Sequence, residues 1–211
     1  MLWNQLQKSF SDYRKIDINP EIQACVALVL KDKANPKLLM IKRATRDDDP
    51  WSGHYGLPGG VVEKDEDLIE AVVRENREEL SLDLEQHQLI GGLDQFQVFK
   101  GRKVLPFVIH PFVYHIKEGS QLKLLKEERE VEDYYWLEIR KLFDPNSLQI
   151  LNFSFGDESK DLPALVYDEL RIWGITYKIL ESFQKALFAD HSLDIHEFLP
   201  DDMEHWIDYP R

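Results

Sequence analysis

The residues best able to do chemistry in this chain are three glutamates spaced like neighbours on a helix. Glu75, Glu78 and Glu79 follow a diglycine loop and lie in a run with helical periodicity. On a wheel of about 100° per residue, Glu75 and Glu79 fall at the edge of the apolar arc, and Glu78 lies just beyond it. The arc consists of Leu68, Ile69, Val72, Val73 and Leu80. Carboxylates beside a core-facing stripe are costly unless paired or metal-bound, so the spacing predicts a site for a hard cation.

A charged, solvated helix is the simpler interpretation of the same run. Asp67, Glu70, Arg74 and Arg77 fall on the opposite side of the wheel. There, Arg74 can pair with Glu70 and with Glu78, each one turn away. Such pairs account for the mixture of charges in the run. They do not account for carboxylates against its apolar edge, which a cation site explains.

The spacing around these glutamates resembles the Nudix box of diphosphate-cleaving hydrolases. The matching positions are Gly60, Glu66, Arg74, Glu75, Glu78, Glu79 and Leu82. Two positions depart from the family pattern. Asn76 stands where the family usually has an apolar or small residue, and Ser81 replaces the glycine that ends the helix. A non-glycine residue in a left-handed cap costs roughly 1 kcal/mol, but neither departure removes an expected metal ligand.

The resemblance implies an α/β Nudix fold, which is an α/β/α sandwich with a mixed β-sheet between helices. It also implies Mg²⁺ or Mn²⁺ as the cofactor. The implied metal ligands are Glu75, Glu78, Glu79 and the backbone carbonyl of Gly60 or Gly59. Glu78 can instead serve as the general base. Arg74 and Glu66 are expected to orient the glutamates through salt bridges.

The loop before the box contains the candidates for substrate binding. Arg43 and Arg46 could form paired bonds to a diphosphate, or they could form surface ion pairs with residues 47–49. Trp51 and His54 could contact a base or a pantetheine arm, or hold the loop against the sheet. A base outside the box is a further hypothesis, for which the candidates are Glu127, Glu128 and Glu130. A solvated charge run is the favoured interpretation of those three.

The elements that must position these residues can be placed from apolar patterns and turn signals. Strands are expected at 22–30, 37–42, 89–99, 104–116 and 134–137, with a short helix within 2–14. Residues 142–163 show no regular pattern, which indicates an insertion or a lid-like loop. Residues 165–188 have helical periodicity, and Trp173 is expected to be a core residue of that helix.

Length and charge limit the remaining choices. The 211 residues predict a single domain over 1–211, with a core at about 22–189 and an acidic extension at 190–211. That extension is compatible with packing along the domain, a homodimer contact or a frayed end. The net charge of −13 argues against a nucleic-acid partner. No apolar run is long enough to span a membrane and no signal peptide is evident, so a cytoplasmic location is expected.

A wider resemblance concerns the substrate. Several segments look like the coenzyme A pyrophosphatase branch and its relatives: 38–43, 49–60, 104–107, 130–132, 135–137 and 171–176. That branch usually has a His-x-Gly-Glu segment and a Phe where this chain has Trp51 to His54 and Leu57. We therefore expect a diphosphatase acting on a nucleoside diphosphate linked to another moiety, with coenzyme A leading.

Other activities remain open at this point. Within the same mechanism, the alternatives are ADP-ribose, nucleotide sugars and nucleoside triphosphates. A silent ligand sensor would be expected to lack a box glutamate, and this chain keeps all three. An isomerase of the isopentenyl diphosphate type would need a catalytic cysteine, but the single Cys25 lies in an apolar run that predicts a buried strand.

Overall fold

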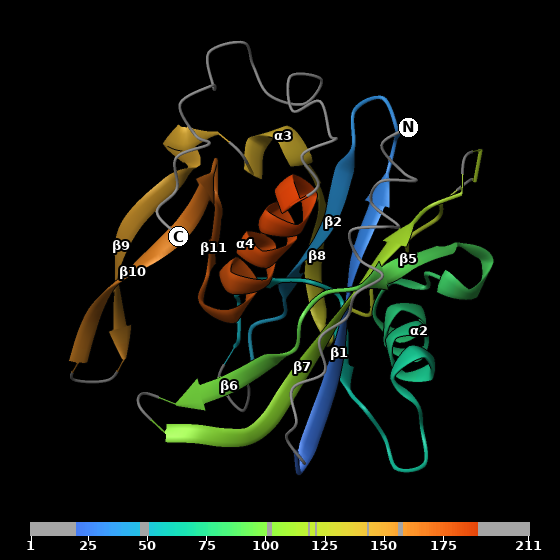
Figure 1. The fold of residues 1–211 in the computed structure, drawn as a ribbon, viewed down its shortest axis with the longest axis horizontal. Helices are drawn as coiled ribbons and strands as arrows, with labels where there is room; N and C mark the ends of the chain where they lie inside the picture. The colour runs from blue at the N-terminus through green and yellow to red at the C-terminus, as the bar shows by residue number, and fades with distance from the viewer. Residues whose placement is uncertain are drawn as a thin grey trace.

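A mixed β-sheet between two helices forms the centre of the computed structural model, which describes residues 20–189 except 47–50, 101–102, 118, 121, 143 and 156–157. Figure 1 shows α2 on one side of the sheet and α4 on the other. The expected α/β/α sandwich is therefore confirmed. The short helix expected within 2–14 and the extension at 190–211 lie outside the described residues.

The central sheet has the path β3-β2-β1-β7-β5, with β4 paired to β1, β6 to β7 and β8 to β2. Strands β1 and β7 are parallel, and the other pairs are antiparallel. The strands are β1 (Ile22–Lys31), β2 (Lys37–Arg43), β3 (Tyr55–Gly56), β4 (Gly59–Val61), β5 (Gln88–Gly92), β6 (Phe96–Lys100), β7 (Lys103–His115) and β8 (Val131–Glu138). The expected strands at 22–30 and 37–42 match β1 and β2.

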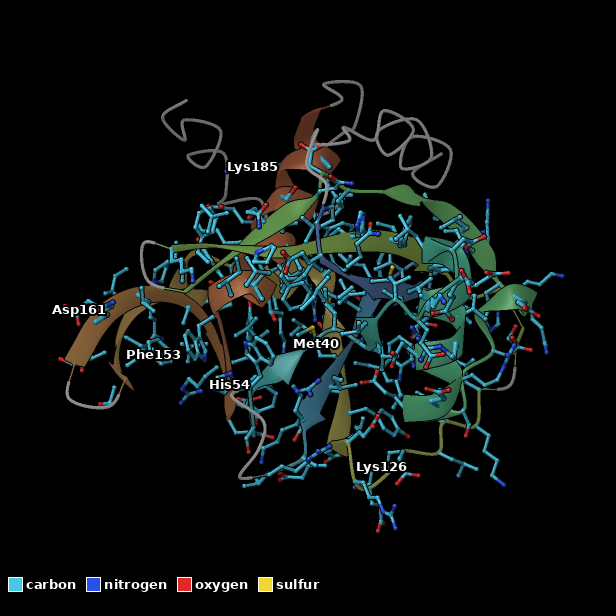
Figure 2. The ribbon with its side chains drawn as sticks, turned by 90° about the horizontal axis from the view of Figure 1, so that it is seen from below. Met40, His54, Lys126, Phe153, Asp161 and Lys185 are labelled. Atoms are coloured by element: carbon cyan, nitrogen blue, oxygen red, sulfur yellow. The ribbon has the colours of Figure 1, made fainter. Side chains whose placement is uncertain are left out.

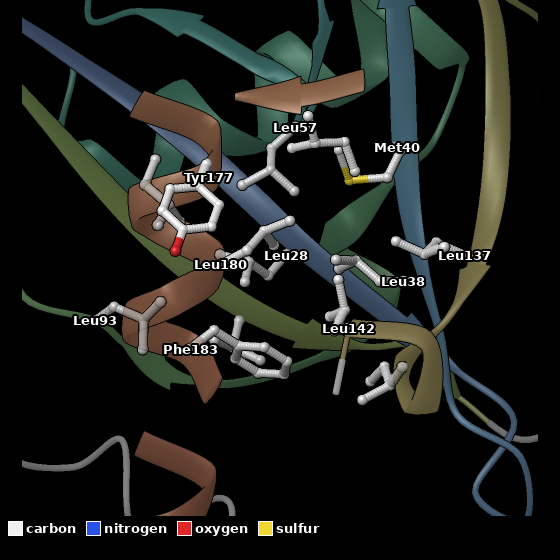
Figure 3. Packing of buried hydrophobic residues seen from close by; sticks show 14 of the residues in the cluster. Leu28, Leu38, Met40, Leu57, Leu93, Leu137, Leu142, Tyr177, Leu180 and Phe183 are labelled. Carbon is white, nitrogen blue, oxygen red and sulfur yellow. The ribbon is translucent and has the colours of Figure 1, made fainter. Parts of the chain in front are cut away.

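Two apolar layers hold the helices against the sheet. On one face, α2 (Leu68–Leu80) packs with β1, β2 and β7, and on the other face α4 (Gly174–Ala189) does so. Figure 3 shows Tyr177, Leu180 and Phe183 of α4 beside Leu28 of β1 and Leu38 of β2. Alternate residues of β1 point to opposite layers, as the period of a strand requires. The near-continuous apolar run of β1 is therefore explained by burial on both faces.

Helix α2 begins and ends at well-defined caps. Asp67 accepts the backbone N–H groups of Ile69 and Glu70, and the Glu70 side chain accepts the backbone N–H of Asp67. This reciprocal capping box places Asp67 at the start of the helix. At the other end Ser81 has φ of 54° and ψ of 29°, the left-handed cap that its position in the motif predicts.

Two expectations, one about a strand and one about a loop, were wrong. The expected strand 89–99 is divided into β5 and β6, which pair with different parts of the long β7. Residues 142–163 are mostly regular: after α3 (Ile139–Leu142) and η2 (Pro145–Ser147) come β9 (Leu148–Phe155) and β10 (Glu158–Tyr167). These last two strands form an antiparallel hairpin, so this segment is not a lid-like loop.

The helix expected at 165–188 begins later than predicted. Residues 165–167 complete β10, and β11 (Leu170–Trp173) pairs with β10 to make a second sheet in the order β11-β10-β9. Helix α4 starts at Gly174, whose φ of +63° turns the chain out of β11. Trp173 is therefore the last residue of a strand rather than a helical core residue. The short 3₁₀ helix η1 (Leu84–Gln86) follows α2 and completes the described elements.

Candidate active site

Glu79 is the most deeply buried carboxylate of the candidate site, with 2% of its surface exposed. One carboxylate oxygen, Oε2, accepts the backbone N–H of Gly59 at 2.8 Å. Burial raises the pKa of Glu79 to about 8, and this hydrogen bond opposes the shift. Glu79 is thus a carboxylate held in a place where its charge needs compensation. A bound cation would provide that compensation.

Gly59 and Gly60 allow the loop to approach β1 and α2 more closely than other residues could. At Gly59, with φ of +143°, an added Cβ would lie 2.1 Å from the carbonyl oxygen of Cys25. At Gly60 it would lie 2.4 Å from Oε1 of Glu75. An added side chain would therefore clash with the rigid backbone of β1 at Gly59, and with the flexible end of a functional side chain at Gly60.

Arg74 joins the acidic residues on the exposed side of the site. Its guanidinium donates two bonds to Glu66, at 2.9 and 3.0 Å, and one to Glu75 at 2.9 Å. It also donates to Glu78 at 3.1 Å and to the carbonyl of Val61 at 2.9 Å. The expected pairing with Glu78 is present, whereas Glu70 caps the helix instead. Arg74 therefore fixes three box carboxylates relative to the loop.

The electrostatic states of these groups differ. Burial raises the pKa of Glu75, against the opposing effect of Arg74. The bond from Arg74 lowers the pKa of Glu66 and keeps it ionised. Glu78 is more open, with 56% of its side chain exposed. Glu75 and Glu79 are consequently the two carboxylates that most need a cation.

A second loop reaches the site from the far end of α2. The backbone N–H of Glu127 donates to the carbonyl of Glu79 at 2.9 Å, and that of Leu125 donates to the carbonyl of Leu80 at 3.0 Å. These bonds satisfy carbonyls that the end of a helix leaves without intrahelical partners. The charge of Glu130 contributes to raising the pKa of both Glu75 and Glu79. Of the three carboxylates considered outside the box, Glu130 is therefore the one that acts on both.

The predicted substrate-binding residues come from the end of β2 and from the loop between β2 and β3. Arg43 lies at the end of β2, where its N–H donates to the carbonyl of His54 at 2.9 Å, and its charge opposes the raised pKa of Glu79. The backbone N–H of Arg46 donates to the hydroxyl of Ser52 at 2.7 Å. Trp51 is 45% exposed. The structure thus brings Arg43 to the acidic site and leaves Arg46 and Trp51 on the surrounding loop.

His54 belongs to an aromatic cluster that the sequence did not reveal. Its ring contacts Trp173 edge-on with centroids 4.9 Å apart, and Phe153 stacks on Trp173 at 4.2 Å. Figure 2 shows His54 between the strands of the central sheet and the hairpin that carries Phe153. Alternation of apolar residues from 151 to 155 was the available signal for β9, but it was hidden in a segment rich in polar residues.

Comparisons with known proteins agree with this architecture. The family model described as NUDIX domain matches residues 21–155. An uncharacterized protein of Schizosaccharomyces pombe is 31% identical over 131 residues, which are 60% of this chain and 38% of that protein. The chain thus covers well under half of that relative. A solved structure, described as a MutT/nudix family protein from Enterococcus faecalis, superposes with a TM-score of 0.52 at 17% identity, covering 88% of this chain and 73% of that one.

Two further relatives have named activities. A mitochondrial coenzyme A diphosphatase of Mus musculus is 27% identical over 167 residues, 77% of each chain. An ADP-ribose pyrophosphatase of Methanocaldococcus jannaschii is 46% identical over 125 residues, 59% of this chain and 64% of that enzyme. Because the family model covers most of the chain, from β1 through the box helix to β9, this protein belongs to the Nudix family and is a Nudix hydrolase.

Proposed function

We propose that this protein is a metal-dependent diphosphatase that cleaves a diphosphate bond in a nucleoside diphosphate linked to another moiety. The observation that carries the proposal is the placement of Glu75 and Glu79. Both carboxylates are held beside the diglycine loop, and burial raises the pKa of each. Such groups gain most when a cation replaces the lost solvent.

The donor set fits Mg²⁺ or Mn²⁺. The candidate ligand side chains in the site offer carboxylate oxygens, which suit hard divalent cations, and Mg²⁺ is commonly held by one or two carboxylates and several waters. Among the described residues, no three acidic, His or Cys side chains form a ready-made metal cluster. Glu75 and Glu79, together with a backbone carbonyl, are therefore the ligands we propose.

The carbonyl ligand we infer is that of Gly59 rather than Gly60. Antiparallel pairing alternates between bonded and non-bonded positions. The N–H of Ala27 donates to the carbonyl of Pro58, and the N–H of Val62 donates to the carbonyl of Gln23. Gly60 lies midway between Pro58 and Val62, so it also occupies a bonded position, and its N–H and carbonyl face β1. Gly59 occupies the non-bonded position between Pro58 and Gly60, so its N–H and carbonyl point away from β1. Its N–H donates to Glu79, and its carbonyl is left for the cation.

The chain's own residues would orient and activate the reactants. A bound divalent ion would neutralise charge on the diphosphate and lower the pKa of an attacking water. Arg74 holds Glu75 and Glu78 in position, and Glu66 fixes Arg74. Glu78 and Glu130 are the carboxylates available to accept the water's proton. Arg43 would bind an oxygen of the diphosphate.

Coenzyme A or a related nucleotide is the substrate class we favour. The support is the mouse coenzyme A diphosphatase, which aligns over 77% of both chains. The archaeal relative, with 46% identity over a shorter region, makes ADP-ribose the second candidate. An isomerase that uses Cys25 is disfavoured because that thiol is fully buried and burial raises its pKa to about 12.

The test is phosphate-product release from coenzyme A, ADP-ribose, nucleotide sugars and nucleoside triphosphates, with Mg²⁺, Mn²⁺ or EDTA. Glu79→Gln is compared with Glu85→Gln, which changes an exposed carboxylate just beyond α2. We expect cleavage of one class, lost in EDTA and reduced about 100-fold or more by Glu79→Gln. An equal effect of both substitutions, or cleavage that persists in EDTA, would contradict the proposal. No cleavage, with tight binding of one compound, would favour a ligand sensor.

A further inference from the structure

The aromatic cluster of His54, Phe153 and Trp173 joins three parts of the chain. Phe153 comes from β9, Trp173 from the end of β11 and His54 from the loop before β3. The planes of Phe153 and Trp173 are inclined by 25°, so the two rings are stacked, whereas His54 meets Trp173 at 65°. All three side chains are partly exposed. The cluster is therefore neither a sealed core nor a set of isolated surface rings.

The second sheet, β11-β10-β9, is called the small sheet below, and its strand register places Phe153 and Trp173 on one face. Phe153 pairs with Lys160, and Trp173 pairs with Ala164, four residues further along the same strand. Directly paired residues, and residues two or four apart on a strand, share a face. The opposite face of β9 carries Ile150, which is 67% exposed. The two aromatic rings thus lie on the face that also carries the cationic Lys160.

The same cluster is connected to the acidic site through a short stretch of chain. The carbonyl of His54 accepts the N–H of Arg43, whose charge acts on Glu79. Five residues after His54, Gly59 donates to the Glu79 carboxylate. Five extended residues span at most about 17 Å. His54 and the proposed metal ligand Gly59 therefore lie within that distance along one loop, which a single nucleotide substrate can span.

We propose that Phe153 and Trp173 form a stacking platform for the planar base of the nucleoside diphosphate, with His54 bordering it on the side of the diphosphate site. The proposal rests on the proposed function, which supplies the nucleotide. Aromatic side chains suit a base because stacking uses the π-face that every base has. Lys160, on the same face as Phe153, adds positive charge beside the platform.

An anchoring role is the alternative explanation for the cluster. In that case, the rings would fix the hairpin to the central sheet and would contact no ligand. Phe153→Leu separates the two roles because leucine keeps an apolar contact but has no π-face. Ile150→Ala is the matched control, since it removes apolar surface from the opposite face of the same strand.

The experiment measures binding of ADP and of inorganic pyrophosphate by calorimetry, using the full chain with Mg²⁺. Neither ligand is a nucleoside diphosphate linked to a second moiety, so the proposed activity does not consume them, and the proposed metal ligands stay intact in every protein compared. Phe153→Leu and Phe153→Ala are each expected to weaken ADP binding about tenfold. Binding of pyrophosphate, which lacks a base, is expected to stay the same, and Ile150→Ala is expected to change neither ligand. Thermal unfolding of each variant reports whether the hairpin remains folded.

Each outcome bears on a defined part of the proposal. Unchanged ADP binding in Phe153→Leu, or an equal loss for ADP and pyrophosphate, would overturn the platform. If the parent protein cleaves a nucleotide while Phe153→Leu leaves KM unchanged, the platform fails and the proposed function stands. If no diphosphate is cleaved but ADP binding depends on Phe153, the platform stands and the proposed function fails.

Discussion

The box region and the small sheet differ in how far apart in sequence their partners lie. In the box, Arg74 bonds to Glu75, Glu78 and Glu66, so one stretch of the chain contains both sides of each interaction. In the small sheet, Trp173 meets Phe153 and also His54, which is far earlier in the chain. Local spacing therefore encodes the acidic site, whereas the aromatic cluster depends on the completed fold.

The largest effect expected in the box region is the pH dependence that Glu79 gives to the free energy of unfolding. Burial raises its folded pKa from 4.5 to about 8, so the folded protein binds an extra proton between these values. The contribution of Glu79 to the free energy of unfolding should therefore be largest below about pH 4.5, and it should fall as pH rises toward 8. Chemical denaturation in EDTA checks this for the parent protein beside Glu79→Gln, which should lose most of the slope.

Added Mg²⁺ gives the complementary measurement. A cation that binds the ionised Glu75 and Glu79 stabilises the folded protein more at pH 8 than at pH 5, because it competes with protons for these carboxylates. The stabilisation should be much smaller in Glu79→Gln. Equal stabilisation of both proteins at both pH values would place the cation elsewhere.

The two adjacent glycines allow a sharper separation of folding from function. Gly59→Ala places a methyl group against the backbone of Cys25 at a positive φ, so we expect a loss of at least about 3 kcal/mol in the free energy of unfolding. Gly60→Ala meets the flexible carboxylate of Glu75, which can move. Compared with Gly59→Ala, Gly60→Ala should lower the free energy of unfolding less and lower the activity of each folded molecule more. Denaturation and kcat/KM, measured on both variants, check the difference.

The loss of stability in the two glycine variants can be compared with the loss caused by Phe153→Leu in the small sheet. That side chain is partly exposed, so its replacement should cost about 1 kcal/mol or less. If Phe153→Leu destabilised the protein as much as Gly59→Ala, the small sheet would be part of the folding core. Its separation from the box region would then be wrong.

The same difference explains which features could be predicted from sequence. The helix, its end at Ser81 and the pairing of Arg74 with Glu78 follow from local patterns. The capping role of Asp67 was found in the structure. The bond from Gly59 to Glu79 spans 20 residues and follows from the fold. The spacing of Trp173 from later apolar residues fits a helix and therefore predicts one there. Strand β11 ends at Trp173, and the positive φ of Gly174 separates it from α4.

Arg74→Lys should have a smaller effect than the changes above. Lysine keeps the charge but cannot bond in parallel to Glu66 while also reaching Glu75 and Val61. We expect kcat/KM to fall about 10- to 100-fold, and the Mg²⁺ concentration for half-maximal activity to rise, since residues that orient metal ligands have effects of this size.

Arg77→Lys is the matched control for Arg74→Lys. Arg77 lies on the same helix, but it pairs with Asp83 and Glu85 outside the site. This exchange should leave both activity and the Mg²⁺ requirement unchanged. If the two exchanges had the same effect on activity, Arg74 would contribute only to the helix and not to the positioning of the glutamates.

The smallest effect comes from one substitution made in each region, serine to glycine. Ser81 adopts a left-handed conformation, so Ser81→Gly should raise the free energy of unfolding by about 1 kcal/mol. Ser159 lies within β10, where glycine loses more conformational freedom on folding, and Ser159→Gly should lower it by about 0.5 to 1 kcal/mol. Denaturation measures both, and activity should not change in either variant. A loss of stability in Ser81→Gly would mean that the serine side chain contributes more at the helix end than its backbone strain costs.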